Sequence, residues 1–170
     1  NLVEYLFSPA SVSPEVEEKA QTIARNVVSK LNLVGILAVE MFLDKEGNIL
    51  VNEVAPRTHN SGHQSIEGNY TSQFEQHMRA ILNLPLGNTD IIIPSVMVNL
   101  LGEPGHTGPA DYQGMSEIIA ERGVYPHLYG KAETKPYRKM GHITIIDPDL
   151  AKAKSKAKWV NETIKVVAKN

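Results

Sequence analysis

The stretch GILAVEMFLDKEGNILVNEV, residues 35–54, consists of two apolar runs joined by a short polar connection. Runs of this length and composition, bounded by turn residues, are typical of strands, so 35–43 and 48–54 are predicted to pair as a β-hairpin. Gly47 supplies the permissive backbone that such a connection needs. The hairpin and the helical patterns around it indicate an α+β fold in which an antiparallel sheet packs with helices.

Each predicted strand carries one carboxylate inside its apolar run. A four-residue connection at 45–48 would place Glu40 opposite Glu53, and opposed side chains share a face. Two carboxylates about 5 Å apart repel by about 3 kcal/mol at an effective dielectric near 20, unless a proton or a cation lies between them. Either both acids face solvent as ordinary strand residues or they hold a hard cation such as Mg²⁺. Their apolar neighbours favour the metal.

The hairpin runs on into a polar segment, VNEVAPRTHNSGH, residues 51–63. Arg57 can fork onto phosphate or carboxylate oxygens, or it can form a surface salt bridge. Asn60, Ser61 and Gly62 offer donors that could surround a small anion. His59 and His63 have the four-residue spacing of a helical zinc pair, but the turn chemistry between them disfavours zinc.

Other elements follow from caps and periodicity. A helix is predicted from the Ser13 cap and Pro14 to about Asn32, and another at 72–83 behind the Ser72–Glu75 capping box. The remaining predictions are strands at 2–8, 124–131 and 141–147, a strand pair or one bent strand at 91–102, a short helix at 115–122, a final helix at 148–167, a long ordered loop at 55–70 and a turn-rich connection at 103–114.

A second cluster of charge lies in KAETKPYRKMGH, residues 131–142, which holds Lys131, Lys135, Arg138 and Lys139. Cations gathered in a loop suit a phosphate site, although a solvated basic loop has the same composition.

Bulk properties exclude several classes of protein. The 170 residues carry a formal net charge of -2, so there is no basic field for nucleic acid or an anionic membrane. The chain has no cysteine, which excludes disulfides and thiolate metal sites. No apolar run approaches the length of a membrane span, and we expect a cytoplasmic protein.

The string VEMF…DKEGNILVNEVAPRTHNSGH…TSQFEQHMRAILNLPLG resembles the carboxy-terminal half of the purine-pathway 5-(carboxyamino)imidazole ribonucleotide synthases, the PurK family of the ATP-grasp superfamily. The strand VMVNLLG and the later RKMGHI string resemble the same family. The resemblance implies a carboxy-terminal ATP-grasp lobe at 1–92 and a small β-rich domain with a terminal helix at 93–170. It also implies a ligase that uses ATP and bicarbonate to carboxylate 5-aminoimidazole ribonucleotide through carboxyphosphate.

The resemblance also implies roles for individual residues. Glu40 and Glu53 would ligate the Mg²⁺, or Mn²⁺, that bridges the ATP phosphates, with Asn52 beside them. Arg57 and His59 would hold bicarbonate and carboxyphosphate. The remaining predicted contacts are Asn60 and Ser61, which would line that pocket, and Lys131 and Arg138, which would bind the ribonucleotide phosphate.

Two departures from the family pattern bear on these expectations. Lys135-Pro136-Tyr137 stands where the family has Arg-Pro-Gly, which puts the geometry of the loop in question. The amino-terminal domain and the central lobe are not in this sequence, so we expect this chain alone to be inactive and its full-length parent to be a homodimer. The alternatives are an ATP-grasp ligase with another acceptor, such as a formate-using transformylase, and a non-catalytic dimerisation or binding module.

Overall fold

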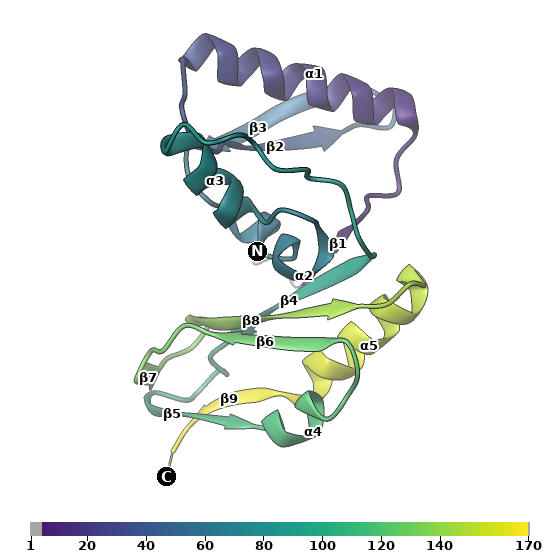
Figure 1. Cartoon of the computed structure of the whole chain (residues 1–170). Coiled ribbons are helices and arrows are strands. Elements are labelled where there is room, and N and C mark those ends of the chain that lie inside the picture. The colour runs from purple at the N-terminus through teal and green to yellow at the C-terminus, as the bar shows by residue number, and fades with distance from the viewer. Residues whose placement is uncertain (1–4, 170) are drawn as a thin grey trace. The chain divides into compact units, whose positions relative to one another are not determined.

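The computed structural model describes residues 5–169, which fall into two compact units (Figure 1). One unit runs from Ala10 to Asp90. The other begins at Ile91 and includes strand β1 (Tyr5–Ser8), which pairs antiparallel with β4 (Ser95–Leu101). The combination of helices with antiparallel strands confirms the α+β prediction. The first residues of the strand predicted at 2–8 lie outside the described part of the chain.

Helix α1 (Pro14–Leu31) opens the first unit, and its ends are those the sequence predicts. The Ser13 side chain accepts a hydrogen bond from the Val16 N–H at 3.4 Å, and Pro14 occupies the first turn. The helix ends where Asn32 turns left-handed, with φ 49°, and its N–H bonds back to the Ser29 carbonyl.

Strands β2 (Ala38–Leu43) and β3 (Ile49–Ala55) form the predicted hairpin. Its connection is tighter than predicted, because the Asp44 N–H bonds to the Asn48 carbonyl at 3.0 Å and only 45–47 remain between them. Gly47 takes a φ of 84° in this loop, as a three-residue hairpin connection requires. The Asp44 carboxylate accepts from the Asn48 side chain and backbone, which lowers the pKa of Asp44.

The segment after β3, predicted as a long ordered loop, includes short helical turns. It contains a 3-10 turn, η1 (Asn60–Gly62), and a short helix, α2 (Ser65–Gly68), before helix α3 (Gln73–Ile81). Ser72 caps α3 by accepting from the Glu75 N–H at 3.2 Å, as half of a capping box does. His77 on α3 accepts from the Ile36 N–H at 3.2 Å, which ties this helix to the entrance of the hairpin.

The second unit contains two antiparallel sheets. The larger has the strand order β1-β4-β8-β6, with β6 at Val124–Leu128 and β8 at Lys139–Ile146. The smaller has the order β7-β5-β9, with β7 at Glu133–Thr134, β5 at Gly108–Gln113 and β9 at Lys165–Ala168. Its helices are α4 (Met115–Ile119) and α5 (Leu150–Thr163).

Two predictions for this unit were wrong in extent. The final helix ends at Thr163, because the buried β-branched residues Val166 and Val167 belong to strand β9. Its partner strand, β5, lies inside the segment predicted as an irregular connection at 103–114. The prolines and glycines around this segment are typical of turns, so no strand was predicted there. The register of this short strand is set by tertiary pairing.

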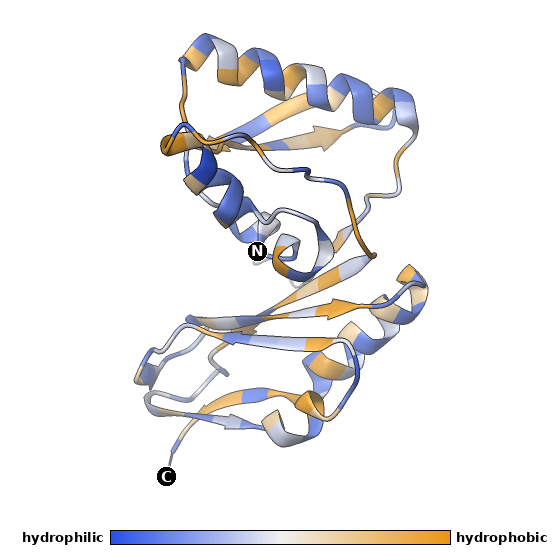
Figure 2. Cartoon of the chain, viewed as in Figure 1, coloured by the Kyte–Doolittle hydropathy of each residue, from blue (hydrophilic) through white to orange (hydrophobic). Residues whose placement is uncertain are grey.

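Apolar burial differs between the two units. In the described part of the chain, the buried apolar side chains belong to the second unit, where α5 packs on β4 and β8. Figure 2 shows hydrophobic residues along β4, β8 and β9. In the first unit, apolar hairpin side chains remain exposed, among them Phe42 at 60% and Leu50 at 55%. No helix within 5–169 is long and apolar enough to cross a membrane.

Candidate active site

A β-bulge creates the pair of acids in the hairpin. From the tight loop, Leu43 lies opposite Ile49 and Met41 lies opposite Val51, so an unbroken ladder would bring Asn52 opposite Glu40. The register shifts between Glu40 and Met41, and Glu53 lies opposite Glu40 instead. The predicted pairing is therefore confirmed, but the bulge at Asn52 produces it and not the length of the loop. Bulges commonly re-aim side chains beside active sites.

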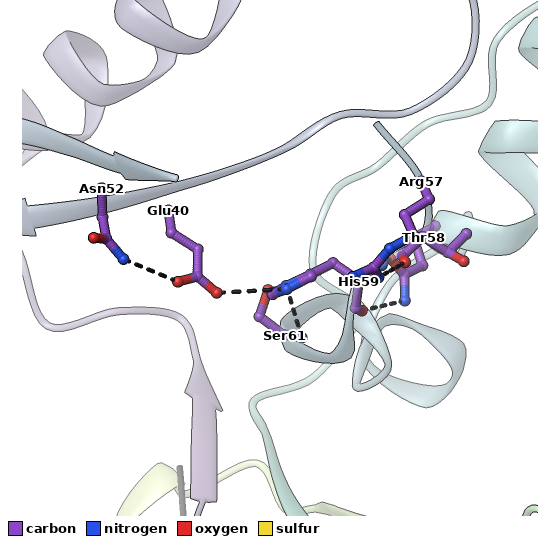
Figure 3. A network of polar contacts seen from close by, with 7 residues as sticks. Glu40, Asn52, Arg57, Thr58, His59 and Ser61 are labelled. Carbon is purple, nitrogen blue, oxygen red and sulfur yellow. Dashed lines mark hydrogen bonds and ion pairs between the residues drawn. The ribbon is translucent and has the colours of Figure 1, made fainter. Parts of the chain in front are cut away.

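Asn52 and His59 lie beside the Glu40 carboxylate (Figure 3). The Asn52 Nδ2 donates to Glu40 Oε2 at 3.4 Å, and His59 Nε2 lies 3.5 Å from Glu40 Oε1. One ligand atom from each of Glu40, Glu53 and His59 lies within 4.8 Å of the other two. The His59 side chain is 15% exposed and that of Glu40 is 41% exposed, so the cluster is open to solvent on the side of the acids.

The chemistry of the ligand atoms in this cluster suits a divalent cation. Mg²⁺ binds oxygen ligands at about 2.0–2.1 Å, so ligand atoms on opposite sides of the ion are about 4 Å apart. The ligand atoms of the cluster lie within 4.8 Å of one another, which is only slightly more than this separation. Carboxylate oxygens are the ligands that Mg²⁺ and Mn²⁺ prefer.

His59 is held by the turn that follows it. It is the N-terminal cap of η1, where its Nδ1 lies 2.8 Å from Ser61 Oγ and accepts weakly from the Ser61 N–H at 3.5 Å. An Nδ1 that accepts leaves the proton of the neutral ring on Nε2, which faces Glu40. The turn chemistry predicted at Asn60, Ser61 and Gly62 is present, because these three residues form η1.

Arg57 lies at the entrance to this turn. Its backbone N–H bonds to the Ala55 carbonyl at 2.8 Å, and its Nη1 donates to the Thr58 carbonyl at 2.9 Å (Figure 3). The Arg57 guanidinium is thereby folded back on its own loop, against the backbone of Thr58, the residue before His59. His63 takes a different direction, because its ring stacks on Phe74 with centroids 5.4 Å apart.

Sequence reasoning missed one residue of this site, Gln73. It is 9% exposed and contacts His59 and His63 through hydrogen bonds of 2.8 Å each. A lone glutamine in the first turn of a helix gives no signal in a single sequence, since this position is usually solvated. The sequence likewise gives no signal that Gly62 lies close to Gln73.

The predicted phosphate-binding residues Lys131 and Arg138 lie in the second unit. Arg138 Nη1 donates to the Glu133 carbonyl at 3.0 Å, and Lys131 Nζ donates to the Lys139 carbonyl. Lys131 Nζ also lies 5.9 Å from the centre of the Tyr129 ring, and burial raises the pKa of Tyr129. Lys131 therefore precedes β7, and Arg138 is the last residue before β8.

The departure at Tyr137 does not remove the turn. The Arg138 N–H bonds to the Lys135 carbonyl at 3.0 Å, Pro136 occupies the second position, and Tyr137 takes a φ of 63° at the third. A turn with proline second and a positive φ third is type II, a position that favours glycine. Tyr137 therefore adopts the left-handed backbone that the family's glycine would take without strain.

Comparison with known proteins agrees with this geometry. Residues 1–74 match the ATP-grasp domain, and residues 95–156 match the phosphoribosylaminoimidazole carboxylase C-terminal domain. The N5-carboxyaminoimidazole ribonucleotide synthase of Bacillus subtilis is 48% identical over 146 residues, which cover 86% of this chain and 37% of that protein. Over most of its length, the chain is therefore similar to a part of the N5-carboxyaminoimidazole ribonucleotide synthases.

Solved structures of this synthase family share the fold. The enzyme from Thermotoga maritima is 52% identical and matches with a TM-score of 0.94 over 97% of this chain and 46% of its own. The Aspergillus clavatus synthase, solved with ADP and 5-aminoimidazole ribonucleotide, is 35% identical with a TM-score of 0.84, over 95% of this chain and 44% of its own. The chain thus spans less than half the length of these synthases.

Proposed function

We propose that this chain provides the metal-binding hairpin and the anion-binding turn of an N5-carboxyaminoimidazole ribonucleotide synthase. The parent enzyme would carboxylate 5-aminoimidazole ribonucleotide with ATP and bicarbonate, by way of carboxyphosphate, in purine biosynthesis. The observation that carries this proposal is the cluster of Glu40, Glu53 and His59, whose ligand atoms lie within 4.8 Å of one another directly before the turn at Asn60.

Glu40 and Glu53 would hold Mg²⁺ or Mn²⁺. The ion would neutralise charge on the ATP phosphate oxygens during phosphoryl transfer. Asn52 supports the pair by donating to Glu40 Oε2, which orients that carboxylate.

Arg57 and His59 would hold bicarbonate and the carboxyphosphate formed from it. A guanidinium matches the two oxygens of a carboxylate-like anion, and the His59 Nε2–H is a donor fixed in direction by Ser61. Asn60 and Ser61 would line the anion pocket with amide and hydroxyl groups. These positive and neutral donors would stabilise charge that develops as the anion accepts a phosphoryl group.

Lys131 and Arg138 would bind the phosphate of the ribonucleotide. Both side chains already donate hydrogen bonds to backbone carbonyls within residues 131–142, so they belong to an ordered segment. We further propose that residues 1–92 and 93–170 correspond to the ATP-grasp lobe and the family's small domain, and that the parent is a cytoplasmic homodimer.

The chain alone is proposed to be inactive. Its match covers less than half of related synthases, and the apolar hairpin surface at Phe42 and Leu50 is exposed. We propose that other residues of the parent cover this surface and bind the adenine.

The test is phosphate release from MgATP and bicarbonate, with and without 5-aminoimidazole ribonucleotide. The full-length parent, its His59→Gln variant and this chain are measured together, and His106→Gln in the second unit, where the ring accepts from the Ala168 N–H, serves as the matched control. Release that the ribonucleotide stimulates in the parent, that His59→Gln reduces by about 100-fold, and that this chain lacks would support the proposal. A parent that responds to formate but not to bicarbonate would reassign the acceptor chemistry.

A further inference from the structure

Gln73 bonds to His59 through both ends of its amide. Its Oε1 accepts from the His59 N–H at 2.8 Å, and its Nε2 donates to the His59 carbonyl at 2.8 Å. The same Nε2 lies 2.8 Å from His63 Nδ1. Since the amide nitrogen can only donate, His63 accepts at Nδ1, and its neutral ring keeps the proton on Nε2. One side chain therefore fixes the backbone of one histidine and the tautomer of another.

The amide itself is fixed by its surroundings. Gln73 is 9% exposed, and its own N–H donates to Ser65 Oγ at 2.9 Å. Ser65 Oγ donates in turn to the Gly62 carbonyl at 2.5 Å. A Cβ on Gly62 would lie 2.6 Å from Gln73 Oε1, so the η1 turn packs against the amide at a distance that only glycine allows.

We propose that Gln73 is a positioning residue that aims the His59 imidazole at Glu40 and the anion pocket. Only a primary amide offers one acceptor and two donors in this geometry. A glutamate would keep the acceptor and lose both donors, and a methionine would lose all three. The effect on turnover rests on the proposed function, whereas the effect on the two histidines does not.

Helix α3 provides a matched control. Gln76 makes the same two-way contact with a different backbone unit, accepting from the Gly87 N–H at 2.9 Å and donating to the Gly87 carbonyl at 3.1 Å. A substitution at Gln76 removes equivalent hydrogen bonds from the same helix without touching His59. It therefore reports what loss of a purely structural clamp does.

The first experiment uses this chain, with Gln73→Met, Gln73→Glu and Gln76→Met. Amide hydrogen exchange is followed at His59, and the imidazole nitrogens of His63 are followed by ¹⁵N NMR, with His63→Gln to assign the signals. Both Gln73 variants should change the His63 nitrogens, and Gln73→Glu should move the proton to Nδ1, because a carboxylate accepts there. Gln73→Met should accelerate exchange at His59 at least tenfold. Gln76→Met should leave both unchanged.

The second experiment uses the full-length parent. Gln73→Met should raise KM for bicarbonate at least tenfold and leave KM for ATP within twofold, and Gln76→Met should change neither. Unaltered His59 exchange and His63 tautomer in both Gln73 variants would overturn the proposal. So would altered histidines with an unchanged bicarbonate KM. A parent without bicarbonate-dependent activity would refute the proposed function, and the NMR result would then decide the Gln73 assignment alone.

Discussion

Neutralising one acid of the hairpin should stabilise it in the absence of metal. Glu40 and Glu53 place carboxylate oxygens within 4.8 Å of each other. Two unit charges at that separation repel by about 1 kcal/mol in water and about 3 kcal/mol at an effective dielectric of 20. Since Glu53 is exposed and the Glu40 side chain is 41% exposed, the lower figure applies. We expect Glu53→Gln to stabilise the hairpin by about 1 kcal/mol.

A bound divalent metal ion should remove or reverse this difference in stability between the wild type and Glu53→Gln. An ion at ten times its dissociation constant stabilises the form that binds it by about 1.4 kcal/mol. The wild-type hairpin should gain this amount, and Glu53→Gln should gain little because half of the carboxylate pair is gone. With Mn²⁺ present, the wild type and the variant should therefore become nearly equal in stability or exchange places.

The assay is amide hydrogen exchange of the hairpin, residues 35–55, with and without Mn²⁺. A change of about 1 kcal/mol corresponds to about a fivefold change in exchange. Glu46→Gln, which removes the same charge from the hairpin loop, is the control, and Trp159 fluorescence reports on the other unit. Equal exchange in Glu53→Gln and Glu46→Gln, or equal protection of both by Mn²⁺, would refute the paired-acid site.

Three further predictions follow from local geometry. Tyr137→Val should destabilise the chain by about 1–2 kcal/mol in urea unfolding, because a β-branched residue tolerates a φ of 63° poorly, whereas Tyr137→Gly should not destabilise it. Gly62→Ala should cost about 1–3 kcal/mol by the same measurement, since its Cβ would overlap the Gln73 amide; an unchanged midpoint would contradict this. Because the pKa of Asp44 is lowered in the folded state, its carboxylate stabilises the fold at pH values above its ordinary pKa of 3.8. This stabilisation is lost as the pH falls through the pKa of the folded state. Asn48→Ala should therefore flatten the acid limb of a pH–stability curve.

The hairpin shows how far sequence reasoning reaches. Apolar runs bounded by turn residues predicted both strands, and Glu40 does lie opposite Glu53. The reason given for that pairing was wrong, because the loop is shorter and the bulge at Asn52 restores the register. A periodicity argument counts residues along a regular ladder, so it has no means of finding an extra residue in one strand.

Residues that act at a distance were beyond prediction. Gln73 is 14 residues from His59 and 10 from His63 along the chain, and no spacing rule relates them.

The turn at Tyr137 was questioned because its glycine is missing. Pro136 and the bond from the Arg138 N–H to the Lys135 carbonyl nevertheless hold it in the left-handed region.

The contrast between the two units explains why the residues that support the site were not predicted. The second unit is organised by apolar burial, which leaves a regular period in β4, β8 and α5. The site-bearing turn is organised by a buried polar network through His59, Gln73 and Ser65. Such a network specifies one arrangement because each unmet partner is costly, but it contributes little net stability. The members of this network are therefore set by geometry and not by a periodic pattern in the sequence.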